Sequence, residues 1–207
     1  MSESHQPRLE SAVRMVLAPV LRADEFSGSG STFRRVVGNW IQVVNVQGAR
    51  QGGSFAINLA VQPLLVPDLA GNDPDTKKIT QELCEFRRRL SEAGTDQWWE
   101  YEQAEESMAS AMKAAASVYT SVGRALLAGI SGPASPFITV TPAEFIAGSF
   151  DFKGFGPTKV RMALALARLR QKEGRRADSM AFAAYGLENV GSAVALRKEL
   201  RQLSEGQ

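Results

Sequence analysis

The pattern of apolar and polar positions at the start of the chain predicts one helix followed by a loop. Apolar residues recur at helical spacing over residues 8–21, which is typical of an amphipathic helix. Pro19 falls near the end of this stretch, and we expect it to tighten or close the last turn because proline removes a backbone donor. The run of glycine and serine over residues 27–31 then predicts a flexible loop, and no Lys-Ser or Lys-Thr follows it to form a phosphate-binding loop.

Residues 32–61 carry the clearest β-strand pattern. Residues 32–37 and 40–47 flank the dipeptide Gly38-Asn39, which is typical of a tight hairpin. The next strand, residues 54–61, alternates strictly, and the residues that share its apolar face are Phe55, Ile57, Leu59 and Val61. This alternation predicts a three-stranded antiparallel meander that is half-covered, with a helix packed on its apolar side.

The segment after the meander has two interpretations. Prolines and a Gly-Asn-Asp run over residues 62–76 predict a long surface loop. In residues 79–90, the positions of Ile79, Leu83 and Phe86 fit a helical face, whereas alternation from Cys84 to Leu90 fits a strand. Periodicity leaves both interpretations open.

The second half of the chain has a helical pattern. Apolar residues form one stripe from about residue 102 to residue 127, which predicts a long helix. Residues 141–144 read Thr-Pro-Ala-Glu, a capping box with proline at the first helical position, and predict a short helix. Three more helices are expected at about residues 158–172, 177–187 and 192–203.

These last helices resemble a single tetratricopeptide-like unit, because alanines and glycines between residues 163 and 184 would let helices approach closely. One such unit cannot bury its own apolar face, so we expect a helical hairpin docked on the rest of the chain. We therefore divide the chain into an α+β domain over residues 8–128 and a helical extension over residues 133–204.

Composition excludes several chemistries. The chain has 207 residues with one cysteine, Cys84, and one histidine, His5, in a polar leader. No Cys/His zinc site, Ser-His-Asp triad or Cys-His dyad can be built from that inventory, and no cofactor fingerprint is present, so we expect no cofactor. The leader lacks a secretory pattern and no stretch approaches about 20 apolar residues, so we expect a cytoplasmic protein without a membrane span.

The net charge of +2 hides an asymmetry along the chain. Residues 68–106 hold 11 acidic and 5 basic residues, whereas residues 158–201 hold 10 basic and 4 acidic residues. The two segments are either solvated faces that complement each other, or the basic segment is a surface for nucleic acid or an acidic partner. Few aromatic residues interleave with the basic ones, so nucleic acid is not the expected partner.

Several motifs together resemble a known family. They are Leu-Ala-Pro-Val-Leu at residues 17–21, Ser-Thr-Phe-Arg-Arg at 31–35, the strands at 40–47 and 54–59, Cys-Glu-Phe-Arg-Arg-Arg-Leu at 84–90, and Asp-Gln-Trp-Trp at 96–99. In this order they resemble the bacterial domain of unknown function 4304 over roughly residues 8–101. Two positions depart from the family pattern: Gly48 stands where serine is commoner, and Glu85 where histidine is frequent.

The resemblance implies an α+β fold and makes residues 84–90 a further strand. We therefore expect an antiparallel sheet of about four strands packed against the N-terminal helix and the long helix, followed by a C-terminal helical hairpin or bundle. The resemblance implies no activity, and a fold alone would not imply one either.

The candidate site lies on the predicted strand at residues 84–90. Arg87 and Arg89 would share one face of it, and arginine can offer a bidentate fork to a carboxylate or phosphate. If Asn58 and Gln42 lie on the same face of the sheet, the four residues form a patch that can bind an anion. In the alternative interpretation the arginines pair with carboxylates of their own chain, namely Asp96, Glu92 or Glu85.

Two neighbouring tryptophans are the other candidates. Trp98 and Trp99 cannot both point the same way on a strand or a helix, so one is expected in the core and the other near the surface. An exposed tryptophan is a preferred anchor of protein interfaces. Cys84 is expected to be a buried small apolar residue rather than a nucleophile.

Three functions follow from these observations. The first is a non-catalytic protein-binding module, for example an immunity- or antitoxin-like protein, that binds another protein through its sheet face and helical tail. The second is an enzyme or a binder of a small anionic ligand that uses Arg87, Arg89, Asn58 and Asp96. The third, nucleic-acid binding by the C-terminal helices, has the least support.

Overall fold

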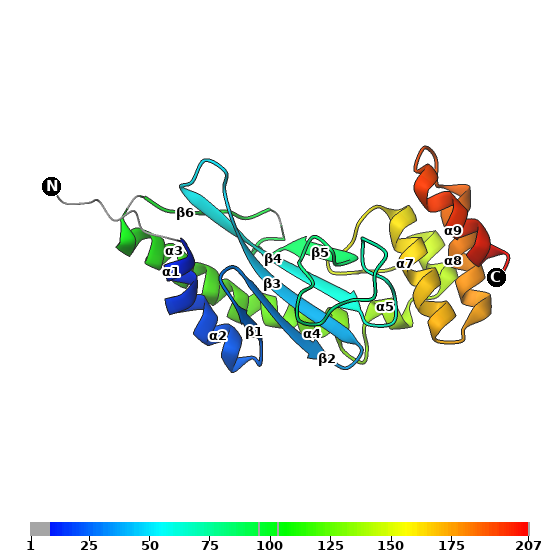
Figure 1. Ribbon diagram of the computed structural model, residues 1–207. Coiled ribbons are helices and arrows are strands. Elements are labelled where there is room, and N and C mark those ends of the chain that lie inside the picture. Colours follow the sequence, from blue (N-terminus) through cyan, green and yellow to red (C-terminus); the bar gives the residue numbers. More distant parts are fainter. Residues whose placement is uncertain (1–8, 95, 103, 207) are drawn as a thin grey trace.

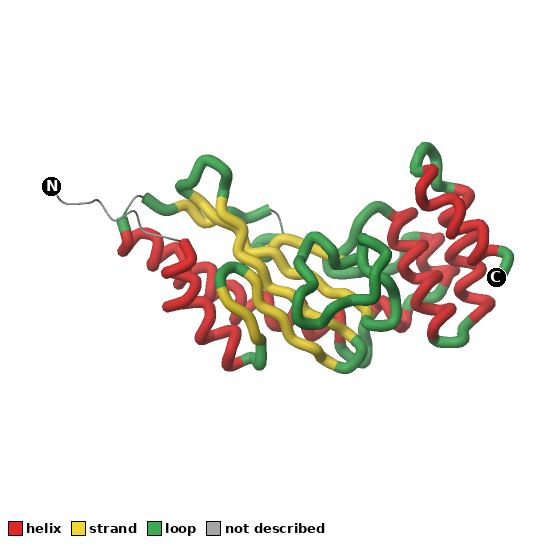
Figure 2. The backbone as a smooth tube through the Cα atoms, in the orientation of Figure 1, coloured by secondary structure: helices red, strands yellow, loops and turns green. Residues whose placement is uncertain are grey.

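The computed structural model describes residues 9–94, 96–102 and 104–206. It combines one antiparallel sheet with helices, and it is elongated (Figure 1). The N-terminal helix and the long central helix lie along one face of the sheet, and three C-terminal helices stand together at one end (Figure 2). The expected α+β class and the expected helical partners of the sheet are confirmed. His5 lies outside the described residues.

The sheet has six described strands where about four were expected. In the order β1-β2-β3-β4-β5 each strand is antiparallel to its neighbour, and β6 pairs with β4 beyond the end of β5. The strands are β1 (Ser27–Ser29), β2 (Thr32–Val37), β3 (Trp40–Gly48), β4 (Ser54–Pro63), β5 (Phe86–Arg89) and β6 (Trp99–Glu100). The predicted meander and the strand interpretation of residues 84–90 are thus confirmed.

The expectation of a flexible loop over residues 27–31 is wrong. Residues Ser27–Ser29 form β1, and Gly28 lies opposite Phe33 of β2. Gly30 turns the chain between the two strands with a φ of 61°, which glycine adopts without steric cost. The run of small residues therefore makes a hairpin, because its glycines take the backbone angles that the hairpin needs.

The N-terminal helix continues through Pro19 rather than closing there. It consists of α1 (Leu9–Ala12), a π-helical turn η1 (Val13–Leu17) and α2 (Ala18–Ala23). Pro19 lies at the start of α2, immediately after a turn in which the Ala18 N–H donates to the Val13 carbonyl. This wider turn accommodates a residue without a backbone donor, so the proline does not end the helix.

The long helix also contains a π-helical turn. It consists of α3 (Glu105–Val118), η2 (Tyr119–Gly123) and α4 (Arg124–Ser131), so it begins three residues later and ends four residues later than expected. Tyr119, from the π-turn, donates to Asp24 at the end of α2 over 2.9 Å, and the Arg124 Nε lies 2.7 Å from the same carboxylate oxygen. These contacts tie the two helices together.

The core lies between the sheet and the helices. The four alternating residues of β4, Phe55, Ile57, Leu59 and Val61, are all fully buried there, as predicted. The opposite face is not uniformly open, since Ile41, Val43 and Ala60 are buried against Ile79 and Cys84 from the loop that connects β4 to β5. Arg34 and Gln62 on this face donate to backbone carbonyls of the covering loop, so an uncovered polar cluster is left at the end of the sheet where β4 pairs with Arg89.

The C-terminal helices extend the same core. They are α5 (Pro136–Thr139), α6 (Pro142–Ala147), α7 (Lys159–Lys172), α8 (Arg176–Glu188) and α9 (Val194–Ser204). The predicted capping box is present at Thr141 and Glu144. The rings of Phe86 on β5 and Phe137 on α5 stack with centroids 3.8 Å apart, and an aromatic cluster continues to Phe182 on α8. The helices α7, α8 and α9 pack together, which confirms the expected C-terminal helical bundle.

Within the part of the chain that the structure describes, no helix is both long enough and apolar enough to cross a membrane. The division into domains over residues 8–128 and 133–204 stays a prediction.

Candidate functional site

Strand β5 separates its arginines onto two faces of the sheet. In register with β4, Arg87 lies opposite Ala60 and Arg89 opposite Asn58, so these side chains point to the outer face. Phe86 is buried on the helix face, and the Arg88 guanidinium on that face donates to the Lys153 carbonyl. The expected shared face of Asn58, Arg87 and Arg89 follows from this register.

Gln42 does not belong to that face, which corrects the expectation. It lies opposite Val61, a residue of the buried apolar face, and is itself only 1% exposed. Its amide donates to the Ser131 hydroxyl over 2.6 Å and accepts from the Arg35 guanidinium over 2.7 Å. Side chains alternate along a strand, and Gln42 shares the parity of Val44 and Val46, so it anchors α4 instead.

The outer face presents one cluster, which we call the outer-face patch: Gln47, Asn58, Arg87, Arg89, Asp96 and Trp98. All except Trp98 line an open depression of about 340 Å³. Its centre is Arg89, whose Nη1 lies 2.9 Å from the Asp96 carboxylate and whose guanidinium lies 4.6 Å from the centroid of the Trp98 ring. Asn58 and Gln47 accept longer bonds from the same guanidinium, each 3.4 Å.

Gln47 was missed by the sequence analysis. It lies in β3 two residues after Asn45, and both side-chain oxygens accept from the Asn58 amide, over 3.0 Å for Gln47 and 3.3 Å for Asn45. The alternation of β3 would have placed both residues on the outer face, opposite to Val44 and Val46. The sequence signal for Gln47 was therefore a polar residue of β3 on the same face of the sheet as Asn58.

In the described part of the chain, only one of the two arginines pairs with a carboxylate of its own chain, which is what the alternative interpretation expected for both. Arg89 forms an ion pair with Asp96, as that interpretation expected. Arg87 is exposed and donates only a 3.2 Å bond to the Glu82 backbone carbonyl among the described residues. One guanidinium of the patch is therefore held in place, and the other is open to a partner.

The two tryptophans divide as predicted. Trp99, in β6, is 6% exposed and stacks on Phe55 with centroids 5.8 Å apart. Trp98 is 37% exposed, and its ring lies against Arg89 in the outer-face patch. Alternation along an extended chain separates the neighbours, because β6 pairs with β4 and directs Trp99 into the core.

Glu85 is not a partner of the patch but the link to the C-terminal helices. It is buried, at 2% exposure, and its carboxylate lies 3.2 Å from Arg168 and 3.4 Å from Arg161 on α7. Arg168 also makes a two-pronged contact of 2.6 Å with Glu199 on α9. Burial raises the pKa of Glu85 above its usual range, and the two arginines oppose that shift. At these residues the acidic and basic segments do complement each other.

The remaining candidate groups offer no reactive centre. Cys84 is buried, its Sγ donates to the Thr80 carbonyl, and burial raises the pKa of its thiol to about 12. A thiol with that pKa stays protonated near neutral pH and is a poor nucleophile. No group of three or more histidine, cysteine, aspartate or glutamate side chains among the described residues could hold a metal ion.

Comparison with known proteins gives one match. Residues 17–122 match the family model described as a domain of unknown function, DUF4304. This region contains the whole sheet, α2, α3 and all but the last residue of η2, but not α7–α9. No curated protein and no solved structure matches the chain.

Proposed function

Because this chain belongs to the DUF4304 family, a membership that assigns no activity, we propose a function from the geometry: the protein is a non-catalytic protein-binding module. The observation that carries this proposal is the outer-face patch, in which the half-exposed ring of Trp98 lies against the guanidinium of Arg89.

Tryptophan and arginine are the residue types most enriched among the residues that dominate binding energy at protein interfaces. Here both are held before a partner arrives, because Asp96, Asn58 and Gln47 fix the Arg89 guanidinium and Arg89 in turn covers the indole. A side chain that is already ordered loses less conformational entropy on binding. The patch is therefore suited to an interface anchor rather than to a solvated surface.

The charge of the patch indicates the kind of partner. Asp96 offsets the charge of Arg89, while Arg87 adds an exposed guanidinium that forms no ion pair with any described residue, although the Glu82 carboxylate lies close enough to interact with it electrostatically. The partner we propose is a protein whose surface presents a carboxylate to Arg87 and an apolar group to Trp98. An immunity- or antitoxin-like role is a finer form of this proposal, and the product of a neighbouring gene is the first partner to test.

The experiment compares partners recovered on the immobilised wild-type chain and on three variants. Trp98→Ala and Arg87→Ala should each lose a protein that the wild type retains, since they remove the anchor and the open charge. Arg201→Ala, which changes an exposed arginine on α9, serves as the matched control and should retain it. The proposal fails if Trp98→Ala and Arg87→Ala recover the same proteins as wild type in the same amounts.

A second function, binding of a small anionic ligand, is favoured by one observation. The open guanidinium of Arg87 and the amides of Gln47, Asn58 and Gln81 line the same depression. Thermal shift with phosphate and citrate tests it. A rise in melting temperature that disappears in Arg87→Ala and persists in Arg201→Ala would favour this function over protein binding.

A further inference from the structure

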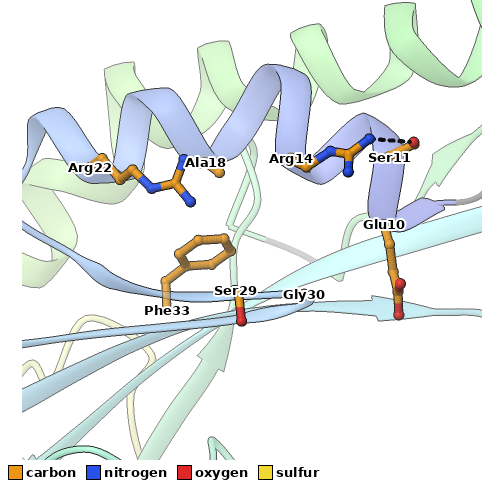
Figure 3. Close-up of a pocket in the computed structure, with 8 residues that line it drawn as sticks. All are labelled: Glu10, Ser11, Arg14, Ala18, Arg22, Ser29, Gly30 and Phe33. Atoms are coloured by element: carbon orange, nitrogen blue, oxygen red, sulfur yellow. Dashed lines mark hydrogen bonds between the residues drawn. The ribbon is translucent and has the colours of Figure 1, made fainter.

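A second cavity lies between the N-terminal helix and the β1–β2 hairpin, far along the chain from the outer-face patch. It has a volume of about 480 Å³ and is lined by both elements (Figure 3). We call it the helix–hairpin groove and define its helix wall by Glu10, Arg14, Ala18 and Arg22. Its opposite wall is the hairpin tip, including Ser29 and Gly30. This is the run of small residues that the sequence alone left without a role.

The π-turn η1 brings two arginines of the helix wall into line. In a regular α-helix two turns take about 7.2 residues, so residues eight apart diverge around the axis by about 80°. The π-turn over residues 13–17 takes up about one extra residue, so Arg14 and Arg22 come to lie on the same side of the helix. Figure 3 shows both side chains on the side that faces the strands, one on each side of Ala18.

Small residues keep the space between the arginines open. Ala18, between them on the helix wall, contributes only a methyl group, and it is buried above the ring of Phe33. On the opposite wall, a Cβ atom added to Gly30 would meet no atom within 4 Å, so the hairpin tip leaves room rather than filling the groove. The result is a short trough with a guanidinium on either side.

The arginines are available to a ligand. Arg14 makes only a long 3.4 Å bond to the Ser11 hydroxyl, and neither Arg14 nor Arg22 forms an ion pair with any residue that the structure describes. Glu10 lies at one end of the trough without such a pair. Arginine binds carboxylate and phosphate oxygens through parallel N–H donors. Two arginines that form no ion pair and lie on the same wall of the groove therefore fit an anionic ligand.

We propose that the helix–hairpin groove binds an elongated small molecule with two anionic groups, phosphate or carboxylate, one at Arg14 and one at Arg22. The two Cα atoms are about 12 Å apart along the helix axis, which calls for two separated charges rather than one compact ion. This site is independent of the outer-face patch and of the function proposed for that patch.

The test uses calorimetry on the full chain with two probes, fructose 1,6-bisphosphate and fructose 6-phosphate. The bisphosphate should bind, and the monophosphate should bind at least about tenfold more weakly because it satisfies one guanidinium only. A third probe, the extended dicarboxylate suberate, has two separated charges and tells carboxylate from phosphate preference. Equal binding of the bisphosphate and the monophosphate, or no binding of any probe, would overturn the proposal.

Variants then locate the binding. Arg14→Ala and Arg22→Ala should each weaken bisphosphate binding by about tenfold or more, because each removes charge-assisted hydrogen bonds. Glu10→Gln should strengthen it by about threefold, since it removes a like charge at the end of the groove. All three positions are exposed, so the variants should keep the wild-type melting temperature.

Arg201→Ala on α9 is the matched control and should bind the bisphosphate as wild type does. Loss of binding in Arg87→Ala, with binding kept in Arg14→Ala and Arg22→Ala, would place the anion on the outer-face patch and overturn the proposal.

Discussion

The carboxylate of Glu85, the residue immediately before strand β5, lies 3.2 Å from the guanidinium of Arg168 on helix α7. The carboxylate is buried, and Arg168 is mostly so, with 15% of its side chain exposed. This ion pair connects the sheet of the DUF4304 region with helices that lie beyond the family match. It therefore adds a buried charged contact to the aromatic packing that joins the C-terminal helices to the sheet.

Replacing Arg168 with methionine should destabilise the protein strongly near neutral pH. The substitution leaves Glu85 with Arg161 alone, and removal of one partner of a buried ion pair costs about 3–5 kcal/mol. The free energy of unfolding from urea titration measures the loss. Arg201→Met, which changes an exposed arginine, is the control and should change it by less than about 0.5 kcal/mol.

The double variant Arg168→Met/Glu85→Gln should recover much of that free energy, because the buried Glu85 carboxylate that lost its partner is then replaced by a neutral amide. If the double variant is as unstable as Arg168→Met alone, the loss comes from packing of the arginine side chain and not from the ion pair.

Glu85 should also give the protein a recognisable dependence on pH. Burial raises its pKa in the folded state, so in the window above its usual value the folded state binds more protons than the unfolded state. Stability from this group is then fully present below about pH 4.3 and is lost as the pH rises through the folded pKa. Urea titrations of wild type and Glu85→Gln at several pH values isolate the effect.

The difference between wild type and Glu85→Gln should move against wild type as the pH increases from about 4 upward. A difference that moves the other way would mean that Arg161 and Arg168 outweigh burial and lower the pKa.

Substitution of the two tryptophans should lower the folding stability by different amounts, because Trp99 lies in the core and Trp98 at the proposed interface. Trp99→Ala empties a core position against Phe55 and should cost about 3–5 kcal/mol. Trp98→Ala removes a half-exposed ring and should cost less than about 1.5 kcal/mol, mainly through the lost contact with Arg89. Thermal and urea unfolding of the two variants tests this. Similar losses in both would show that Trp98 is a core residue and would remove the basis for the proposed interface.

Cys84 should resist modification while the protein is folded. Its thiol is buried and has a pKa of about 12, so little thiolate forms near neutral pH. At pH 8, a thiol-specific reagent such as dithionitrobenzoate should react slowly with the native protein and within seconds to minutes in urea. Rapid reaction without urea would mean that the loop between β4 and β5 opens readily.

Local patterns predicted those features that depend on neighbours in the chain. Alternation in residues 54–61 determined which face of β4 is buried, and the spacing of Thr141 and Glu144 determined a capped helix start. The same alternation separated Trp98 from Trp99. Each of these follows from the period of a strand or a helix, so the sequence sufficed.

The tertiary structure decided the pairings between distant residues. Gln42 lies on the helix face because of its position in the alternation of β3. Only the fold shows that its amide donates a hydrogen bond to the Ser131 hydroxyl there. The sequence made Glu85 one of three possible ion-pair partners for the arginines of β5. In the structure it pairs with Arg161 and Arg168, which are more than seventy residues away in the chain. Charge pairing depends on distance in space, which a linear sequence does not contain. For the same reason the π-turn that aligns Arg14 with Arg22 became visible only in three dimensions.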